Sequence, residues 1–336
     1  MSRVWVDIAN SPHATFFKPV VDVLRERGHQ VILTAWDRAQ TADLARRYWP
    51  EVEVVGAGSD RSVVQKSLRI WKRARGLAAA VRDARPDVAL GHNSYSQVIA
   101  ARLLLRTRAV TMMDYEHQPA NHLAFRLAHD VVVPAHFPED AARKMGARRK
   151  LLRYDGFKEE ITLAVFRPEA GFRSSLGVTD DEVLVASRPP PDGALYHRHS
   201  NDLFARAIET VAAQGATVLL SPRTVEQGRS YSTIEGVRVL EHAVSGLDLL
   251  WASDLVVGAG GTMTREAAIL GTPSYTLFSG KPAAVDGALI ESGRLVRVSD
   301  AAAVAAIPVV RKPRVEWTPP EHRVTDVVTL LEKTFS

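Results

Sequence analysis

Short apolar runs rich in valine, leucine and isoleucine alternate along this chain with longer segments in which apolar residues recur every three or four positions. The short runs predict buried strands, and the longer segments predict amphipathic helices. Because the two kinds alternate throughout, the pattern favours βαβ units with parallel sheets over an all-helical or an all-β fold.

The first half of the chain contains six of these strand-like runs. They lie at residues 4–8, 30–35, 52–55, 88–91, 109–113 and 131–134. The first helix is expected at residues 16–27, where Gly28 provides a stop signal. Residues 10–13 should then form a loop between the first strand and this helix.

The same alternation starts again after Tyr154. Further strands are predicted at residues 183–187, 217–221, 237–240, 255–257, 274–277 and 295–298, and the helices between them at 201–214, 246–252, 262–270 and 283–292. The sequence therefore predicts two Rossmann-like, doubly wound α/β domains, at residues 1–165 and 166–318, joined near Pro168 and Gly171. A C-terminal helix within residues 319–336 is expected to pack back on the first domain.

Length and composition agree with this organisation. A chain of 336 residues suits two domains of ~150 residues each. Apolar residues make up 46% and charged residues 24%, which is typical of a soluble globular protein. The absence of cysteine excludes disulfides, thiolate metal sites and cysteine nucleophiles. The sequence shows neither a signal-peptide pattern nor an apolar run near the ~20 residues that span a bilayer, which predicts a cytoplasmic protein.

The net charge of +5 is distributed unevenly, with basic clusters in residues 61–85 and 143–153. Solvated helix faces would explain both clusters. The functional alternatives are a phosphorylated substrate and peripheral contact of residues 61–85 with the inner face of a membrane. Nucleic acid is not an expected partner, because the chain has no zinc-finger, RNP-type or helix-turn-helix pattern.

Residues 255–266 carry the most specific chemical signal. They read as a buried strand, a glycine turn and the start of a helix. At such a turn the free N–H groups and the positive end of the helix dipole favour a phosphate, and Thr262 adds a hydroxyl donor. Glu266, one helical turn further, can accept hydrogen bonds from ribose hydroxyls. No lysine follows the glycines, so the turn is not a P-loop, and it does not match GxGxxG either.

Two simpler interpretations of this segment remain open. The glycines could form a tight turn that binds nothing, and Glu266 could merely complement the helix dipole.

This Gly-Gly-x-x-x-x-Glu helix, ending in Gly-x-Pro at residues 271–273, resembles the nucleotide-sugar site of GT-B glycosyltransferases. It is also similar to the site of UDP-N-acetylglucosamine 2-epimerases, as is the loop at residues 279–287. The resemblance implies two Rossmann-like domains facing each other across a cleft. It also implies that Gly260, Gly261 and Thr262 meet the diphosphate of the donor and that Glu266 meets its ribose.

Polar side chains follow three predicted strands of the first half. Since the carboxyl ends of parallel strands lie at one edge of a sheet, we expect these side chains near one another. They are Asn10, Ser11 and His13; His92 and Asn93; and Asp114, Glu116, His117 and Asn121.

Among these residues His13 is the candidate general base for an acceptor hydroxyl, because histidine titrates near neutral pH. Asp114, Glu116 or His117 could tune the pKa of His13 from across the sheet, and Glu116 is the alternative base. The others are assigned to the acceptor side. His13 could also simply hold its loop, and Ser11 could cap the following helix. A zinc site of His13, His92, His117 and Asp114 matches no metal motif, so neither a metal nor a cofactor is expected.

The first half also resembles the N-acetylglucosaminyltransferase that forms lipid II. That enzyme has a histidine after its first strand and a His-Glu-Gln-Asn loop at the position of residues 114–121. The whole chain resembles domain-of-unknown-function family 354, a family of predicted glycosyltransferases. The residues that carry this match include 7–13, 114–117 and 154–159.

One departure separates the chain from the epimerases. They have an aspartate at the position of Asn93 and a Pro-Glu-Glu segment that is absent here. Elimination and re-addition of UDP requires those carboxylates, so epimerisation is disfavoured. An epimerase-like enzyme and an inactive nucleotide-sugar-binding protein remain the alternatives.

Basic side chains at strand ends complete the candidate donor site. Arg188 and Arg223 each follow a strand of the second half and could bind a diphosphate bidentately, although either could instead form a surface ion pair. His242 could lie beside the nucleobase, and Tyr196, His197 and His199 could line the cleft.

The leading hypothesis is a metal-independent glycosyltransferase that uses a nucleotide-diphospho-sugar, most simply a UDP-sugar, and a lipid-linked or polysaccharide acceptor.

Overall fold

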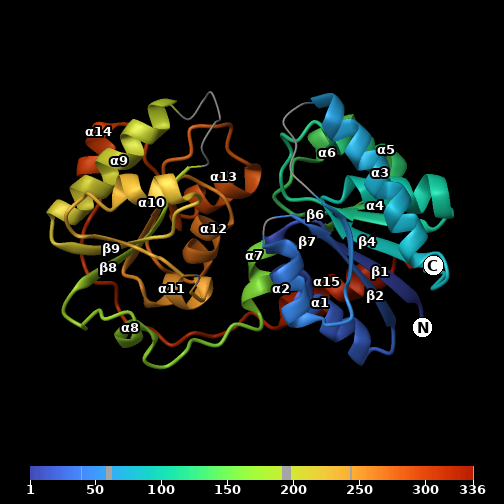
Figure 1. The fold of residues 1–336 in the computed structure, drawn as a ribbon, viewed down its shortest axis with the longest axis horizontal. Helices are drawn as coiled ribbons and strands as arrows, with labels where there is room; N and C mark the ends of the chain where they lie inside the picture. The colour runs from blue at the N-terminus through green and yellow to red at the C-terminus, as the bar shows by residue number, and fades with distance from the viewer. Residues whose placement is uncertain (39, 58–62, 191–197, 243, 336) are drawn as a thin grey trace. The chain divides into compact units, whose positions relative to one another are not determined.

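The structure is a computed structural model that describes residues 1–38, 40–57, 63–190, 198–242 and 244–335. The chain forms two compact units (Figure 1). Unit 1 comprises residues 1–165, 283–285 and 320–336, and unit 2 comprises residues 166–282 and 286–319. Each unit is built on a parallel sheet with helices packed against it, which confirms the predicted fold class.

The sheet of unit 1 has seven parallel strands in the order β3-β2-β1-β4-β5-β6-β7. The strand order reverses direction between β1 and β4, which is the position at which doubly wound sheets bind ligands. The strands are β1 (Arg3–Ile8), β2 (Gln30–Asp37), β3 (Glu53–Ala57), β4 (Val88–His92), β5 (Arg108–Met112), β6 (Asp130–Pro134) and β7 (Leu151–Tyr154).

Helices cover both faces of this sheet, with α1, α2 and α15 on one side and α3, α4 and α5 on the other (Figure 1). The helical segments are α1 (Ser11–Glu26), α2 (Thr41–Tyr48), α3 (Val63–Val81), α4 (Tyr95–Ile99), η1 (Ala100–Leu105), α5 (Asn121–Leu127), α6 (Glu139–Met145), η2 (Arg148–Lys150), α7 (Lys158–Leu163) and α15 (His322–Glu332).

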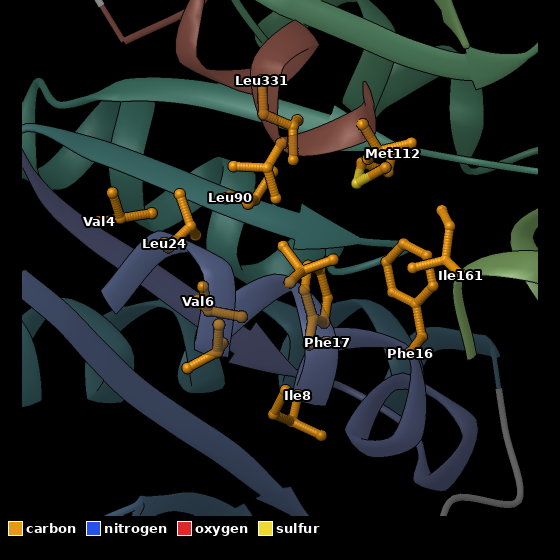
Figure 2. Close-up of a cluster of buried hydrophobic side chains, with 14 of the residues drawn as sticks. Val4, Val6, Ile8, Phe16, Phe17, Leu24, Leu90, Met112, Ile161 and Leu331 are labelled. Atoms are coloured by element: carbon orange, nitrogen blue, oxygen red, sulfur yellow. The ribbon is translucent and has the colours of Figure 1, made fainter. Parts of the chain in front are cut away.

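Alternate side chains of β1 enter two different cores, because successive residues of a strand point to opposite faces. Val4, Val6 and Ile8 pack with helix α1, and Leu331 of α15 belongs to the same cluster (Figure 2). Trp5 packs on the other face with α3. Asp7 shares that second face and must therefore find polar partners there.

Unit 2 has a six-stranded parallel sheet in the order β10-β9-β8-β11-β12-β13, which reverses between β8 and β11. The strands are β8 (Val183–Arg188), β9 (Ala216–Leu220), β10 (Val237–Val239), β11 (Leu255–Gly258), β12 (Ser274–Thr276) and β13 (Leu295–Arg297). The helices are α8 (Phe172–Ser175), α9 (Arg198–Ala213), α10 (Val225–Tyr231), α11 (Gly246–Ala252), α12 (Thr262–Ile269), α13 (Ala284–Glu291) and α14 (Ala301–Ala305).

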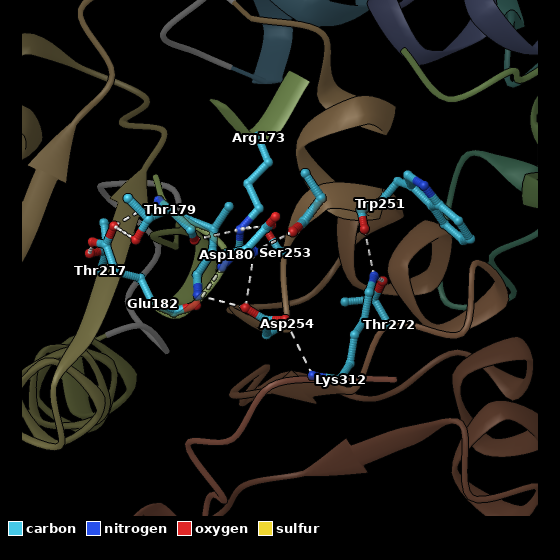
Figure 3. Close-up of polar contacts among 12 residues, drawn as sticks. Arg173, Thr179, Asp180, Glu182, Thr217, Trp251, Ser253, Asp254, Thr272 and Lys312 are labelled. Atoms are coloured by element: carbon cyan, nitrogen blue, oxygen red, sulfur yellow. Dashed lines mark hydrogen bonds and ion pairs between the residues drawn. The ribbon is translucent and has the colours of Figure 1, made fainter. Parts of the chain in front are cut away.

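A buried polar network at the amino ends of β8 and β11 holds together distant segments of unit 2 (Figure 3). Asp254 accepts hydrogen bonds from the Leu184 N–H at 2.8 Å, from Arg173 at 3.1 Å and from the Lys312 N–H at 3.2 Å. The Lys312 ammonium donates to the Trp251 carbonyl and to the Thr272 hydroxyl, each at 2.6 Å, and burial lowers its pKa to about 7. The opposite edge of the sheet carries the glycine turn.

Two local predictions were wrong. Strand β7 was not predicted, because Leu151–Tyr154 is a short edge strand that follows a basic cluster and pairs only with β6. Helix α1 begins at Ser11 rather than at residue 16, and Pro12 stands in its first turn. Proline suits that turn because its φ is already helical and its missing N–H would have no intrahelical partner. His13 therefore lies on a helix and not in a loop.

Asp7 is completely buried and forms a bidentate ion pair with Arg73 of α3, with both N–O distances 2.8 Å. The hydroxyl of Thr34 donates to Asp7 at 2.7 Å, and Ser94 Oγ donates to it as well. Arg73 also donates from its Nε to the Val55 carbonyl at 3.1 Å. Arg73 belongs to the basic stretch 61–85, but it is 2% exposed and cannot contribute to a solvated or membrane-facing surface.

We expect Asp7→Ala to lower the free energy of unfolding by about 3–5 kcal/mol, because it leaves the Arg73 charge buried without its partner. Urea unfolding followed by tryptophan fluorescence measures the change. Asp87→Ala is the matched control: Asp87 pairs with Arg3 of the same strand, but both side chains are about 40% exposed, so its loss should be close to neutral. Equal effects of the two substitutions would contradict this account.

Candidate functional site

The reversal of strand order in unit 1 brings the polar residues of the first half to one edge of the sheet. Asn10 and His13 follow β1, His92 and Asn93 end and follow β4, and Asp114 follows β5. These residues come from separate βα units of the chain.

His13, His92 and Asp114 form a buried row. The rings of His13 and His92 lie 4.8 Å apart between centroids, and His92 Nε2 lies 3.5 Å from Asp114 Oδ1. Phe16 packs edge-on against the His92 ring, with 5.4 Å between the centroids. His13 is only 5% exposed, and its Nδ1 has no hydrogen-bond partner among the described residues.

This environment determines the charge of His13. Burial lowers its pKa well below the ordinary value, and the neighbouring His92 and Lys158 lower it further. The carboxylate of Asp114 acts in the opposite direction. His13 is therefore a neutral imidazole near pH 7, with a ring nitrogen that can accept a proton.

Lys158 is a site residue that the sequence analysis did not select. It is the first residue of α7, it is 7% exposed, and its Nζ lies 2.6 Å from Asp114 Oδ2 and 3.8 Å from Glu159 Oε1. A signal was present, since a lysine in the first turn of a helix opposes the helix dipole and usually needs a local acidic partner. Its position could not be inferred because strand β7, which places α7 at this edge, was not predicted.

Three other candidates mainly support the loop after β5 and the start of α1. Glu116 is buried, with Oε1 3.4 Å from His117 Nε2. Asn121 is completely buried and donates to the Tyr115 carbonyl at 2.9 Å. Ser11 does not cap α1; its hydroxyl lies 3.2 Å from that of Thr41.

Unit 1 also contains a cavity of about 490 Å³, whose lining includes the residues that directly follow β1 and β4. Asn93 stands at its edge with φ +55°, a left-handed conformation that is uncommon for residues other than glycine and frequent at functional sites. The cavity is lined by Ala9, Asn10, Trp36, Arg38, Arg69, Ile70, Arg73, Asn93, Ser94, Tyr95, Ser96 and Gln118.

The glycine turn of unit 2 lies at the corresponding position of the second sheet, between β11 and α12. Gly260 and Gly261 have φ values of +90° and +92°, which strongly favour glycine. A Cβ at Gly260 would lie 2.8 Å from Phe278 Cβ, whereas one at Gly261 would have no atom within 4 Å. Helix α12 begins at Thr262, and no side chain caps it. Its first N–H groups therefore adjoin an exposed glycine.

Arg188 and Glu266 flank this turn. The pairing of β8 with β11 places Arg188 beside Gly258. Burial lowers the pKa of Arg188, and the charge of Glu266 opposes this effect in part. Arg265 on the same helix is engaged elsewhere, with its Nε 3.1 Å from Asp286 Oδ1.

The other donor-side candidates are less directly placed. Arg223 donates to the Pro189 carbonyl at 2.9 Å and so braces the loop after β8. His242 is exposed on the loop after β10. Tyr196 and His197 lie outside the described residues, and so does the side chain of His199.

No group of three or more histidine, aspartate and glutamate residues with the geometry of a metal site occurs in the described part of the chain. Within the same residues, no helix is both long enough and apolar enough to cross a bilayer.

A family model described as "Protein of unknown function (DUF354)" matches residues 2–315. The chain belongs to this family. The family resemblance noted in the sequence is thereby confirmed. An uncharacterized protein of Methanocaldococcus jannaschii, similar to this DUF354 protein, is 26% identical over 304 residues that cover 88% of each chain.

Solved structures similar to this DUF354 protein include UDP-GlcNAc 2-epimerases. That of M. jannaschii, in complex with UDP-GlcNAc and UDP, has a TM-score of 0.73 at 12% identity and covers 98% of this chain and 99% of its own. That of Rickettsia bellii has a TM-score of 0.72 at 14% identity and covers 100% of this chain and 97% of its own. The glycosyltransferase of kitacinnamycin has a TM-score of 0.56 at 15% identity and covers 100% of this chain and 96% of its own. At these identities the likeness shows the GT-B-like fold alone.

We expect the imidazole of His13 to stay neutral at pH values well below 6.5, the ordinary pKa of histidine. The unfolded chain binds this proton more readily, so the contribution of His13 to stability is present above about pH 6.5 and is lost as the pH falls towards the lowered folded pKa. NMR titration of labelled histidine, with His13→Gln to assign the resonance, measures the pKa. A value at or above 6.5 would contradict the buried environment described here.

Proposed function

We propose that this DUF354 protein is a glycosyltransferase that moves a sugar from a nucleotide-diphospho-sugar, most simply a UDP-sugar, to an acceptor hydroxyl. The observation that carries the proposal is the uncapped start of α12 beside Gly261, with Arg188 and Glu266 next to it. Two of the similar epimerase structures contain UDP-GlcNAc, which supports a nucleotide sugar as the ligand.

Each donor-side residue has a role that its chemistry suits. The N–H groups at Gly260, Gly261 and Thr262 bind the diphosphate, and the Arg188 guanidinium offsets the charge that develops on it. The Glu266 carboxylate accepts hydrogen bonds from the ribose hydroxyls. Arg223 supports this site through the loop after β8, and we assign His242 to the nucleobase side.

The transfer step balances without a metal. The acceptor oxygen forms a bond to the anomeric carbon, the bond from that carbon to the diphosphate oxygen breaks with its electron pair, and the acceptor proton passes to a base. We assign the base to His13, which is neutral near pH 7 and whose protonated form Asp114 favours. Glu116 is the competing base, because its buried carboxylate could accept the same proton.

The rival activities fit less well. Epimerisation by elimination needs a carboxylate at the position of Asn93, and an amide cannot exchange a proton in that way. A protein that only binds nucleotide sugars would not need a buried row of two histidines and an aspartate at the edge of the other unit.

The acceptor is proposed to be lipid-linked, with a polysaccharide as the alternative. On α3, Leu68 is 67% exposed and Trp71 is 38% exposed, next to the exposed cations Lys72 and Arg75. Apolar and basic side chains on one helix favour peripheral contact with an anionic bilayer. This contact would be at the cytoplasmic face of the membrane.

We expect Glu266→Ala to weaken UDP binding by roughly 1.5–3 kcal/mol, the range for hydrogen bonds to a charged group. Isothermal titration calorimetry with UDP measures the change. Glu209→Ala, an exposed carboxylate of α9, is the control and should leave the affinity unchanged. An unaltered affinity for Glu266→Ala would mean that this glutamate only complements the dipole of α12.

We expect His13→Gln to lower turnover by ~10²–10⁴-fold, the span for loss of a general base, with UDP affinity nearly unchanged. Transfer of a labelled sugar from UDP-N-acetylglucosamine, assayed first as hydrolysis and then with candidate acceptors, measures the rate. Glu116→Gln is assayed in parallel. If Glu116→Gln causes the large loss and His13→Gln does not, the base is Glu116.

A further inference from the structure

Three arginines surround one tryptophan at the cavity of unit 1. The guanidinium carbons of Arg73, Arg38 and Arg69 lie 4.9, 5.4 and 6.0 Å from the centroid of the Trp36 ring. Trp36 belongs to β2, and Arg69 and Arg73 are four residues apart on α3, so they lie on one face of that helix. The indole holds the guanidinium groups in place by cation–π contact.

Beneath the cavity, Arg73 forms the bidentate pair with buried Asp7. The twelve described residues that line the cavity include no aspartate or glutamate. Arg38 is exposed and forms no ion pair with any residue in the described part of the chain. A cavity with arginine side chains and no carboxylate among its described lining residues favours an anion as its ligand.

The rest of the lining is suited to hydroxyl groups. Asn93 Oδ1 is buried and has no hydrogen-bond partner among the described residues, although the residue lines the cavity. Ser94 donates its proton to Asp7, so its oxygen remains an acceptor for a ligand hydroxyl. Ser96 and Gln118 add further polar groups to the lining. The Asn93 amide oxygen and the Ser94 oxygen can accept hydrogen bonds from ligand hydroxyl groups, and the nearby arginines can bind an anionic group. The cavity therefore suits a ligand that has both.

We propose that this cavity binds an acceptor that carries a phosphate group beside its hydroxyl-bearing part, such as a sugar phosphate. That the ligand is the acceptor rests on the proposed glycosyl transfer, whereas its phosphate group is inferred from the cavity alone. Arg38 and Arg69 bind the phosphate oxygens, a role for which the planar guanidinium is well suited. The volume of about 490 Å³ holds one phosphorylated sugar unit and falls within the range of small-molecule sites.

The same phosphate chemistry has two sources, a soluble sugar phosphate and the phosphate of a lipid. Arg69 and Ile70 line the cavity from α3, next in sequence to the exposed Leu68 and Trp71. The experiment therefore needs one arm for each source.

In the first arm, the full chain without nucleotide is titrated calorimetrically with N-acetylglucosamine 1-phosphate and with neutral N-acetylglucosamine. We expect binding of the phosphate ester only, weakened about 10–100-fold by Arg38→Gln and by Arg69→Gln. Arg75→Gln is the matched control, because Arg75 lies on the same helix but is exposed and packs on Trp71, 5.8 Å from its ring centroid. Its affinity should equal that of the unaltered chain.

In the second arm, co-sedimentation compares vesicles of phosphatidylcholine with vesicles that also contain phosphatidic acid. Lipid as the source predicts binding to the acidic vesicles that Arg38→Gln reduces and that Arg47→Gln, the control at an exposed arginine of α2, does not. Equal loss in Arg38→Gln and in the control of the arm that shows binding, Arg75→Gln for the phosphate ester or Arg47→Gln for vesicles, would indicate a general charge effect and overturn the proposal. Binding of neither source, or binding that neither Arg38→Gln nor Arg69→Gln weakens, would overturn it as well.

A UDP titration of the same variants separates this proposal from the proposed function. Arg38→Gln and Arg69→Gln should bind UDP as the unaltered chain does, because the donor is assigned to unit 2. Phosphate-ester binding without any UDP binding would refute the glycosyltransferase assignment and leave the phosphate site standing. UDP binding with no phosphate site would do the opposite.

Discussion

The buried pair of Asp7 and Arg73 is the interaction on which the candidate site of unit 1 depends. It joins the end of β1 to α3, and through Thr34, Val55 and Ser94 it also joins β2, β3 and the start of α4. A buried ion pair is favourable only when further hydrogen bonds support it. Here Asp7 also accepts from Thr34 and Ser94, and Arg73 also donates to the Val55 carbonyl. Asn10 and Asn93 stand at the cavity beside this point, one after each strand that meets there.

In each unit the candidate site lies where the strand order of the sheet reverses, but the residues at this position differ. In unit 2 the reversal of strand order carries glycines, an uncapped helix start and two opposite charges, which is an arrangement suited to a diphosphate and a ribose. In unit 1 it carries buried histidines, a carboxylate with its lysine, and a cavity with arginines. This difference is the basis for assigning donor and acceptor to separate units.

Burial lowers the pKa of a basic side chain in each unit, but only one of the two residues lies at a candidate site. Around His13 it favours the neutral imidazole, which is the form able to take a proton. At the far edge of the second sheet it lowers the pKa of Lys312, which connects the segment before α15 to β8 and β11 and has no place in the proposed chemistry. A perturbed pKa therefore marks a functional candidate only where topology also places the residue at a ligand-binding edge.

The sequence by itself determined the fold class, the glycine turn, and the presence of polar residues after β1, β4 and β5. Such features are local: hydrophobic periodicity, glycine and strand ends are read within a few residues. Only the tertiary structure decided that Lys158 reaches Asp114 and that Arg73 is buried against Asp7. Those facts depend on contacts between residues 44 and 66 positions apart, and no local pattern encodes which distant charge a buried group will meet.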